Sequence, residues 1–166
     1  MNTGQMLLTL GALALLSLTI LNMNKVFNLN EELLNETRFG LETVALATSI
    51  IEEASQLPFD EVSWDSTKLR KDVSDFTLAE DLGADEDETD YDSFDDFDDF
   101  NNYQITQSTL QNNYSISCEV AYIDYSDLDT PLSNRTYYKK LTVRITNPFT
   151  AGTFEMSYIH GYWYFN

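Results

Sequence analysis

The N-terminal part of the chain is a run of helix-forming residues that is uniformly apolar at first. Residues 6–21 are apolar apart from Thr9, Ser17 and Thr19, and residues 1–24 carry no charged side chain. As an α-helix the apolar run would span about 24 Å, close to the ~30 Å hydrocarbon core of a bilayer. We therefore predict a hydrophobic helix over residues 1–24 that can lie in a membrane.

Three interpretations of this helix compete. A cleaved signal peptide requires a basic residue before the apolar run and a small-residue cleavage site after it. The first positive charge is instead Lys25, and residues 21–24 offer no such site. A permanent single-pass anchor fits the composition. Small residues such as Gly11, Ala12 and Ala14 equally favour close packing between helices in apolar surroundings, so the last two interpretations stay open.

The next stretch, residues 25–57, is predicted to continue the helix with an amphipathic surface. Residues 22–30 hold several asparagines, which weaken a helix and mark a place where it could loosen. Strong helix formers follow until Pro58, which cannot extend a helix, so the helix should end one or two residues earlier. Unbroken from Thr3, it would hold about 54 residues and measure about 80 Å.

Apolar residues recur along this helix at steps of three and four, which predicts a face that packs on the rest of the domain. A second apolar set lies off that stripe, so more than one side of the helix is apolar. A deeply buried helix and a second face for neighbouring molecules would each account for this pattern. The first set is Val26, Leu29, Leu33, Leu41, Val44, Ala47, Ile51 and Ala54, and the second is Phe39, Leu46, Ile50 and Leu57.

In the C-terminal part the pattern changes to a period of two, which predicts half-buried β-strands. Residues 114–122 and 140–146 alternate apolar and polar side chains, and two more strands are expected over residues 153–165 and 103–110. Short connections between successive strands favour an antiparallel sheet, which needs a cover on one face. We therefore predict an α+β fold in which the long N-terminal helix packs against a C-terminal antiparallel β-sheet over residues 103–166.

An acidic region separates the helix from the sheet, over residues 58–102. Residues 80–99 hold twelve carboxylates and no basic side chain, and such a block repels itself and is usually a solvated loop. Calcium binding is the alternative, because oxygen-rich loops hold hard cations. The candidate ligands are Asp95, Asp96, Asp98 and Asp99. Phenylalanines at positions 94, 97 and 100 predict that residues 91–103 are ordered, with their rings against the sheet.

The composition narrows the classes of function. A formal charge of −19, from 28 acidic and 9 basic residues, would repel nucleic acid and anionic membrane surfaces. Cys118 is the sole cysteine, so no disulfide forms within one chain. No phosphate-binding loop, nucleophile elbow or His-carboxylate metal motif occurs, and the single histidine, His160, is predicted to be a strand residue. We therefore expect neither an enzyme nor a required cofactor.

Three glycosylation sequons occur in the sequence. They begin at Asn35, Asn113 and Asn134. Asn134 lies in an expected surface loop and is the best candidate of the three, since the modified residue must be exposed.

The layout as a whole resembles the type IV pilins and pseudopilins, in which an apolar half-helix continues as an amphipathic half-helix and an antiparallel sheet packs on it. Residues 45–61, ALATSIIEEASQLPFDE, look like the end of the long helix in many pilin-like proteins. Residues 94–103, FDDFDDFNNY, look like an acidic stretch found in some of them. The proline that is common in the middle of the family's apolar half-helix is absent here.

This resemblance implies a structural subunit of an extracellular type IV pilus-like filament. The chain would lie in the inner or cytoplasmic membrane before assembly and would then form a helical polymer with copies of itself at the cell surface. If Met1 is the first mature residue, the fifth position, where the family has glutamate, is the uncharged Gln5. The helix positions assigned in this way to packing in the filament core are Gln5, Leu7, Leu10, Gly11, Ala14, Leu18 and Leu21.

Two alternatives remain open on the sequence. A minor pseudopilin of a secretion or uptake system would share the fold. A membrane-anchored surface domain whose acidic loop holds Ca²⁺ would need the N-terminal helix only as an anchor.

Overall fold

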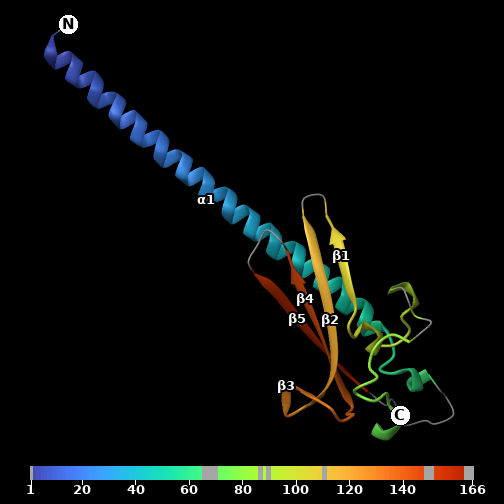
Figure 1. Cartoon of the computed structure of the whole chain (residues 1–166). Helices are drawn as coiled ribbons and strands as arrows, with labels where there is room; N and C mark the ends of the chain where they lie inside the picture. Colours follow the sequence, from blue (N-terminus) through green and yellow to red (C-terminus); the bar gives the residue numbers. More distant parts are fainter. Residues whose placement is uncertain are drawn as a thin grey trace. The chain divides into compact units, whose positions relative to one another are not determined.

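The computed structural model describes residues 2–64, 71–85, 88, 91–109, 112–147 and 152–162 (Figure 1). The chain divides into two units, residues 1–42 and residues 43–166. The second unit is called the head. The helix α1 runs from Thr3 to Gln56 and contributes residues to both units.

The helix α1 has the length and the end that the sequence predicts. It is 54 residues long, and it ends at Gln56, two residues before Pro58. The asparagine-rich residues 22–30 are helical throughout, because asparagine costs only about 0.5 kcal/mol per position and strong helix formers follow. α1 is long and apolar enough to cross a membrane.

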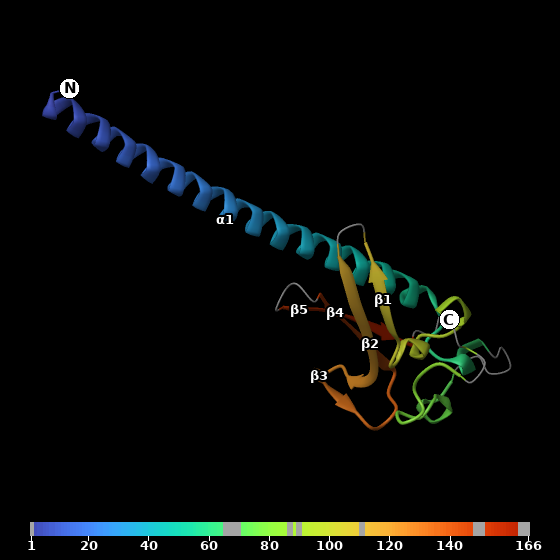
Figure 2. The same cartoon turned by 45° about the horizontal axis from the view of Figure 1, so that its top comes forward.

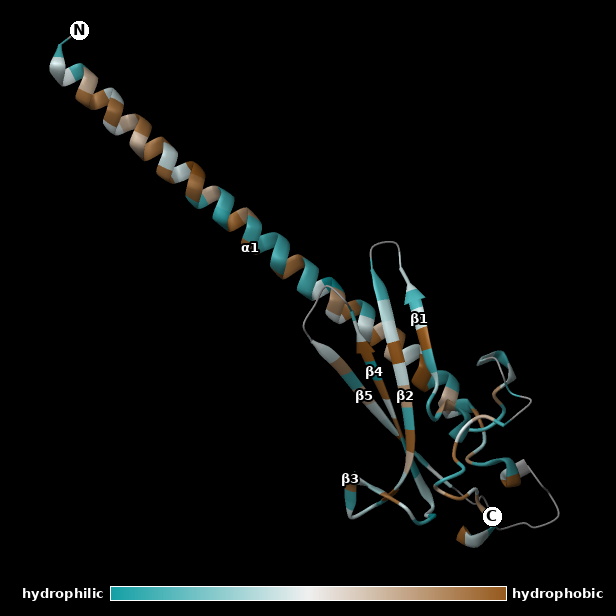
Figure 3. Cartoon of the chain, in the orientation of Figure 1, coloured by the Kyte–Doolittle hydropathy of each residue, from teal (hydrophilic) through white to brown (hydrophobic). Residues whose placement is uncertain are grey.

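The hydroxyl groups in the apolar part of α1 are satisfied within the helix itself. The hydroxyl groups of Thr9, Ser17 and Thr19 each donate a hydrogen bond to a backbone carbonyl one turn earlier, at 2.7–2.9 Å. Such a bond removes the cost of placing a polar group in apolar surroundings. Figure 3 accordingly shows the first part of α1 as mostly hydrophobic, with hydrophilic positions becoming frequent further along.

The head is built on a five-stranded antiparallel sheet. The strands are β1 (Gln104–Ser108), β2 (Asn113–Asp124), β3 (Asp127–Leu132), β4 (Tyr138–Thr146) and β5 (Thr153–Gly161). The order is β1-β2-β4-β5, and β3 pairs with the far end of β2. The four predicted strands are confirmed over their described residues; the end of the last, beyond residue 162, lies outside them. The short edge strand β3 was not predicted, because its proline and acidic residues carry no strand pattern.

The predicted alternation of buried and exposed positions is confirmed. The inward side chains of β2 and β4 are almost fully buried, and they are Tyr114, Ile116, Cys118, Val120, Tyr122, Leu141, Val143 and Ile145. On the opposite face Arg144 donates to Glu119 at 2.6 Å and to Glu155 at 2.9 Å. One face of the sheet is therefore core and the other is polar surface.

The C-terminal turns of α1 cover the core face of the sheet, as predicted (Figures 1 and 2). Thr43, Ala47, Ile50 and Ala54 are buried, at helical spacings of four, three and four. The apolar stripe expected from the sequence is partly wrong, because Ile50 belongs to the second apolar set and Val44, from the first set, stays exposed. Small side chains at 43, 47 and 54 let the helix backbone approach the sheet.

The described residues between α1 and β1 are folded against the rest of the head. Short 3-10 turns lie at Glu61–Trp64, Val73–Asp75, Tyr91–Ser93 and Asp98–Phe100. Phe97 and Phe100 are buried, so the predicted order of residues 91–103 is confirmed. The prediction that the acidic block is a solvated loop is wrong for part of it, because Asp96, Asp98 and Asp99 are buried as well.

The close approach of α1 to the sheet can be tested at Ala47, which is fully buried. Ala47→Leu should lower the free energy of unfolding of the head by about 1–3 kcal/mol, since there is no room for the added methylenes. Ala45→Leu, two positions away on an exposed site of the same helix, should change it by less than about 0.5 kcal/mol. Thermal unfolding of the purified chain followed by circular dichroism measures both, and equal effects would contradict the assigned face.

Candidate functional site

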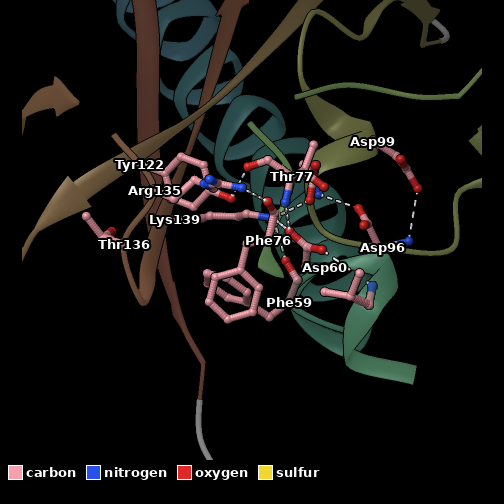
Figure 4. A network of polar contacts seen from close by, with 12 residues as sticks. Phe59, Asp60, Phe76, Thr77, Asp96, Asp99, Tyr122, Arg135, Thr136 and Lys139 are labelled. Carbon is pink, nitrogen blue, oxygen red and sulfur yellow. Dashed lines mark hydrogen bonds and ion pairs between the residues drawn. The ribbon is translucent and has the colours of Figure 1, made fainter. Parts of the chain in front are cut away.

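A buried lysine lies at the centre of the head. Lys139 is on β4, two residues before the inward-facing Leu141, and its side chain is fully buried. Its ammonium group donates to the carbonyl oxygen of Phe59 at 2.7 Å, to Oδ2 of Asp60 at 3.0 Å and to Oδ1 of Asp98 (Figure 4). All three N–H donors of the ammonium therefore have acceptors.

Asp60 connects this lysine to the segment that follows α1. Its carboxylate is fully buried. Oδ2 also accepts the backbone N–H of Thr77 at 2.9 Å, and Oδ1 accepts that of Val62 at 3.4 Å. The phenol of Tyr122 on β2 donates to the carbonyl of Thr77 at 2.7 Å. One carboxylate thus holds residues from two loop segments against β4.

Asp98 lies in a tight turn in which the carboxylates of Asp96 and Asp99 accept backbone N–H groups. Oδ1 of Asp96 accepts the backbone N–H of Asp98 at 2.8 Å. Oδ2 of Asp99 accepts the backbone N–H groups of Asp95 and Asp96, both at 2.9 Å. The backbone of the turn therefore supplies part of the positive potential that allows these aspartates to be buried.

The carboxyl groups of this turn do not titrate alike. Burial raises the pKa of Asp98, and the ammonium of Lys139 opposes that rise. Burial and the neighbouring charges of Asp98 and Asp99 raise the pKa of Asp96 to about 9. Asp96 is therefore protonated at neutral pH, and the buried turn carries less negative charge than its sequence indicates.

Aromatic rings enclose the lysine and its carboxylate partners. The ammonium nitrogen lies 4.6 Å from the centre of the Phe59 ring and 5.4 Å from that of Tyr122. Phe59 contacts Phe76, with ring centres 4.9 Å apart, and Phe76 contacts Tyr162 at 5.1 Å. Phe59, Phe76 and Tyr122 are themselves buried. The polar centre is thus sealed from bulk water by apolar groups.

Cys118 is buried in the core of the head, and His160 is half-buried beside buried aromatic rings. His160 is on β5, as predicted, and its ring stacks on Phe97 at 4.8 Å and on Phe59 at 6.0 Å. Burial and the nearby charge of Lys139 lower the pKa of His160. Burial raises the pKa of the Cys118 thiol to about 12, so this cysteine is a protonated core residue at neutral pH.

A second group of carboxylates lies at the edge of the acidic region. Oxygen atoms of Glu88, Asp95 and Asp99 lie within 4.8 Å of one another. Burial and the charge of Asp99 raise the pKa of Glu88 to about 7. Of the four candidate calcium ligands, Asp95 and Asp99 meet here. Asp98 contacts Lys139 instead, and Asp96 caps the backbone of Asp98.

The group at Glu88 has part of what Ca²⁺ requires. The ion takes six to eight oxygen ligands, and three carboxylates would supply three to six of them with water completing the shell. Oε2 of Glu88 already accepts the backbone N–H of Asp85 at 3.1 Å, and Oδ2 of Asp99 accepts two N–H groups.

The other predicted site residues are exposed. The seven helix positions assigned to filament packing lie on α1 within residues 5–21, and all are exposed in the single chain. The sequon residues Asn35, on α1, Asn113, at the start of β2, and Asn134, after β3, are exposed as well. Each side chain is accessible to the partner or enzyme that the prediction requires, and both assignments stay predictions.

The lysine-centred site was missed by sequence reasoning, although one signal for it exists. The period of two that makes Leu141, Val143 and Ile145 face inward also places Lys139 inward. A lysine at a core position needs a buried partner. The sequence does not say which of its many carboxylates fills that role, because Asp60 and Asp98 are 79 and 41 residues away along the chain.

Comparison with known proteins adds nothing to this geometry. No family model, no curated protein and no solved structure matches the chain.

The lysine-centred site can be tested by comparing two adjacent lysines. Lys139→Met should lower the free energy of unfolding by about 3–5 kcal/mol, because it leaves Asp60 and Asp98 without their cation in an apolar site. Lys140→Met is the matched control. Its ion pair with Asp129, at 3.3 Å, involves an aspartate side chain that is 97% exposed, so its loss should cost about 1 kcal/mol or less. Urea unfolding measures the free energy of unfolding of both variants, and equal decreases would contradict this assignment.

Proposed function

We propose that the chain is a structural subunit of a type IV pilus-like filament, assembled through the apolar part of α1. The observation that carries this proposal is the extent of exposed apolar surface on α1. A bilayer covers about 20 helical residues, yet large apolar side chains stay exposed well beyond that length. Val26, Phe27 and Leu33, for example, are 55–59% exposed.

A membrane that covers the first apolar stretch, residues 6–23, leaves a second apolar stretch, residues 26–34, in water. Exposed apolar surface of this extent marks a site of contact with protein or membrane. Charged residues such as Glu31, Glu32 and Arg38 are interspersed with it, so residues 25–42 fit an interface between helices better than they fit lipid. Neighbouring copies of α1 would cover both stretches at once, which supports self-assembly over a simple anchor.

The small residues of the first stretch support the same proposal. Gly11 and Ala14 have no large side chain, and a Cβ added at Gly11 would meet no atom of the chain itself. Small residues allow helices to approach closely where the hydrophobic effect gives no drive to associate. Gln5, with a neutral amide, would also cost less to bury among apolar helices than a carboxylate.

The proposal can be tested with two substitutions of equal hydrophobicity. Ala14→Leu places a large side chain on the side of the helix that Gly11 and Leu18 share. Ala12→Leu places it nearly opposite, because two residues turn the helix by about 200°. Both variants should insert into the membrane as the native chain does. We expect filaments sheared from cells to be lost or sharply reduced for Ala14→Leu only.

Negative-stain microscopy with peptide identification in the sheared fraction measures the result. Absence of this chain from sheared filaments of cells carrying the native sequence would rule out the filament proposal. A minor pseudopilin of a secretion or uptake system would instead appear as a trace component, with filaments built from another protein. Normal filaments from both alanine variants would contradict the assigned packing face.

A second candidate function rests on the carboxylate group at Glu88. In that case the chain is a membrane-anchored surface domain whose acidic region holds Ca²⁺. The convergence of Glu88, Asp95 and Asp99 favours it, because a cation would offset both the burial and the repulsion from Asp99 that raise the pKa of Glu88 to about 7.

Calcium binding predicts a rise in thermal stability. Millimolar Ca²⁺ should raise the Tm of the purified chain by several degrees relative to chelator, since a ligand that binds only the folded state stabilises it by mass action. Glu88→Gln should abolish the rise, whereas Glu80→Gln, elsewhere in the acidic block, should leave it unchanged. Equal Tm values with Ca²⁺ and with chelator would exclude this second function, and extraction as a monomer would favour it over the filament.

A further inference from the structure

The lysine-centred site has the parts of a condensation reaction. An amine nitrogen, Nζ of Lys139, contacts the carboxyl oxygen of Asp98, and a second carboxylate, that of Asp60, lies 3.0 Å from the same nitrogen. The side chain of Lys139 is fully buried, as is that of Asp60, and only 4% of the Asp98 side chain is exposed. We propose that Lys139 and Asp98 become joined by an intramolecular amide bond, with Asp60 carrying the protons.

The geometry holds the reacting groups in one place. Lys139 is fixed by the β4 ladder, and Asp98 by its backbone hydrogen bond to Asp96 at 2.8 Å. Asp60 is fixed independently of the lysine, because its Oδ2 also accepts the N–H of Thr77 at 2.9 Å. Fixed reactants of this kind reach effective concentrations of about 10⁵ M or more, far above those of free amines and acids.

The surroundings favour the amide over the ion pair. The rings of Phe59 and Tyr122 lie 4.6 and 5.4 Å from the nitrogen and exclude water, the reagent that would reverse the bond. A buried ion pair keeps the desolvation cost of both charges, and a neutral amide removes those of Lys139 and Asp98. The carboxylate of Asp60 then keeps the backbone N–H groups of Thr77 and Val62 as its donors. The remaining amide N–H can still donate to the carbonyl of Phe59, which the ammonium contacts at 2.7 Å.

The reaction balances without a further reagent. Asp60 accepts one proton from the Lys139 ammonium and passes it to the carboxylate of Asp98, which becomes a neutral acid. The amine nitrogen then attacks Cγ of Asp98 and loses a second proton to Asp60. That proton goes to the hydroxyl of the tetrahedral intermediate, which leaves as water. The ammonium and the carboxylate are thus converted to one amide and one water, and Asp60 ends as it began.

The bond would connect the acidic layer to the sheet. Asp98 and Lys139 are 41 residues apart, and β1, β2 and β3 lie between them. A covalent link there closes a loop around most of the sheet and restricts the unfolded chain in the way a disulfide would. Cys118 cannot supply such a link alone, since it is the sole cysteine. This inference concerns the head and is independent of the proposed filament function.

Mass spectrometry of the full native chain tests the bond directly. Trypsin should cleave after Lys71, Arg135 and Lys140 but not after an acylated Lys139. We expect peptide 72–135 linked to peptide 136–140, lighter than their sum by one water, about 18 Da. Fragment ions should place the link at Asp98. The exposed pair Lys140 and Asp129, 3.3 Å apart, is the internal control and should stay unlinked.

Variants test the role of each group. Lys139→Arg keeps a cation but removes the reactive amine, so the chain should keep its circular dichroism spectrum and lose the link. Asp60→Asn keeps the shape and an oxygen acceptor but cannot carry protons, so the linked fraction should fall at least tenfold.

The peptide digest of the native chain tests the proposal even if a variant fails to fold. Folded native chain that releases unmodified peptide 136–139 in full yield, without the linked pair, would overturn it. A link from Lys139 to Asp60 would overturn the assignment of Asp98 as the acyl group. Full linkage in folded Asp60→Asn would overturn the role of Asp60.

Discussion

The structure of the head depends on how one buried cation is neutralised. The ammonium of Lys139 has no contact with water, so its three N–H donors must all find acceptors inside the protein. These acceptors come from two segments outside the sheet, the segment after α1 and the acidic turn at Asp98. The requirement therefore positions two segments that have little regular secondary structure of their own.

The neutralisation of Lys139 also explains why part of the acidic block is buried. Its composition predicts repulsion and solvation, and a charge of −19 for the whole chain favours the same conclusion. Burial nevertheless reaches Asp96, Asp98 and Asp99, because Lys139, backbone N–H groups and protonation of Asp96 offset their charge. The phenylalanines at 97 and 100 then supply apolar area to hold the turn on the sheet. The outer carboxylates, such as Asp92, remain in water as the composition predicts.

Local patterns predicted most of the fold, and contacts between distant residues set what they missed. The end of α1 follows from Pro58, and the strands follow from the period of two, since both signals act within a few residues. The buried face of α1 was assigned only in part, because choosing between Ile50 and Val44 depends on the sheet that the helix meets. The partners of Lys139 were missed for the same reason: residues 79 and 41 positions away leave no local signal.

The helix α1 is divided between two units, with buried side chains in one and exposed, mostly apolar side chains in the other. The buried side chains of α1 are Thr43, Ala47, Ile50 and Ala54, all in the second unit. Residues 3–38 of α1 are exposed, so their side chains can suit another environment. Its exposed leucines cost nothing in stability if lipid or neighbouring helices cover them, and they would promote aggregation in water. So much exposed apolar surface in the first unit of α1 is thus best understood as a requirement of whatever covers it.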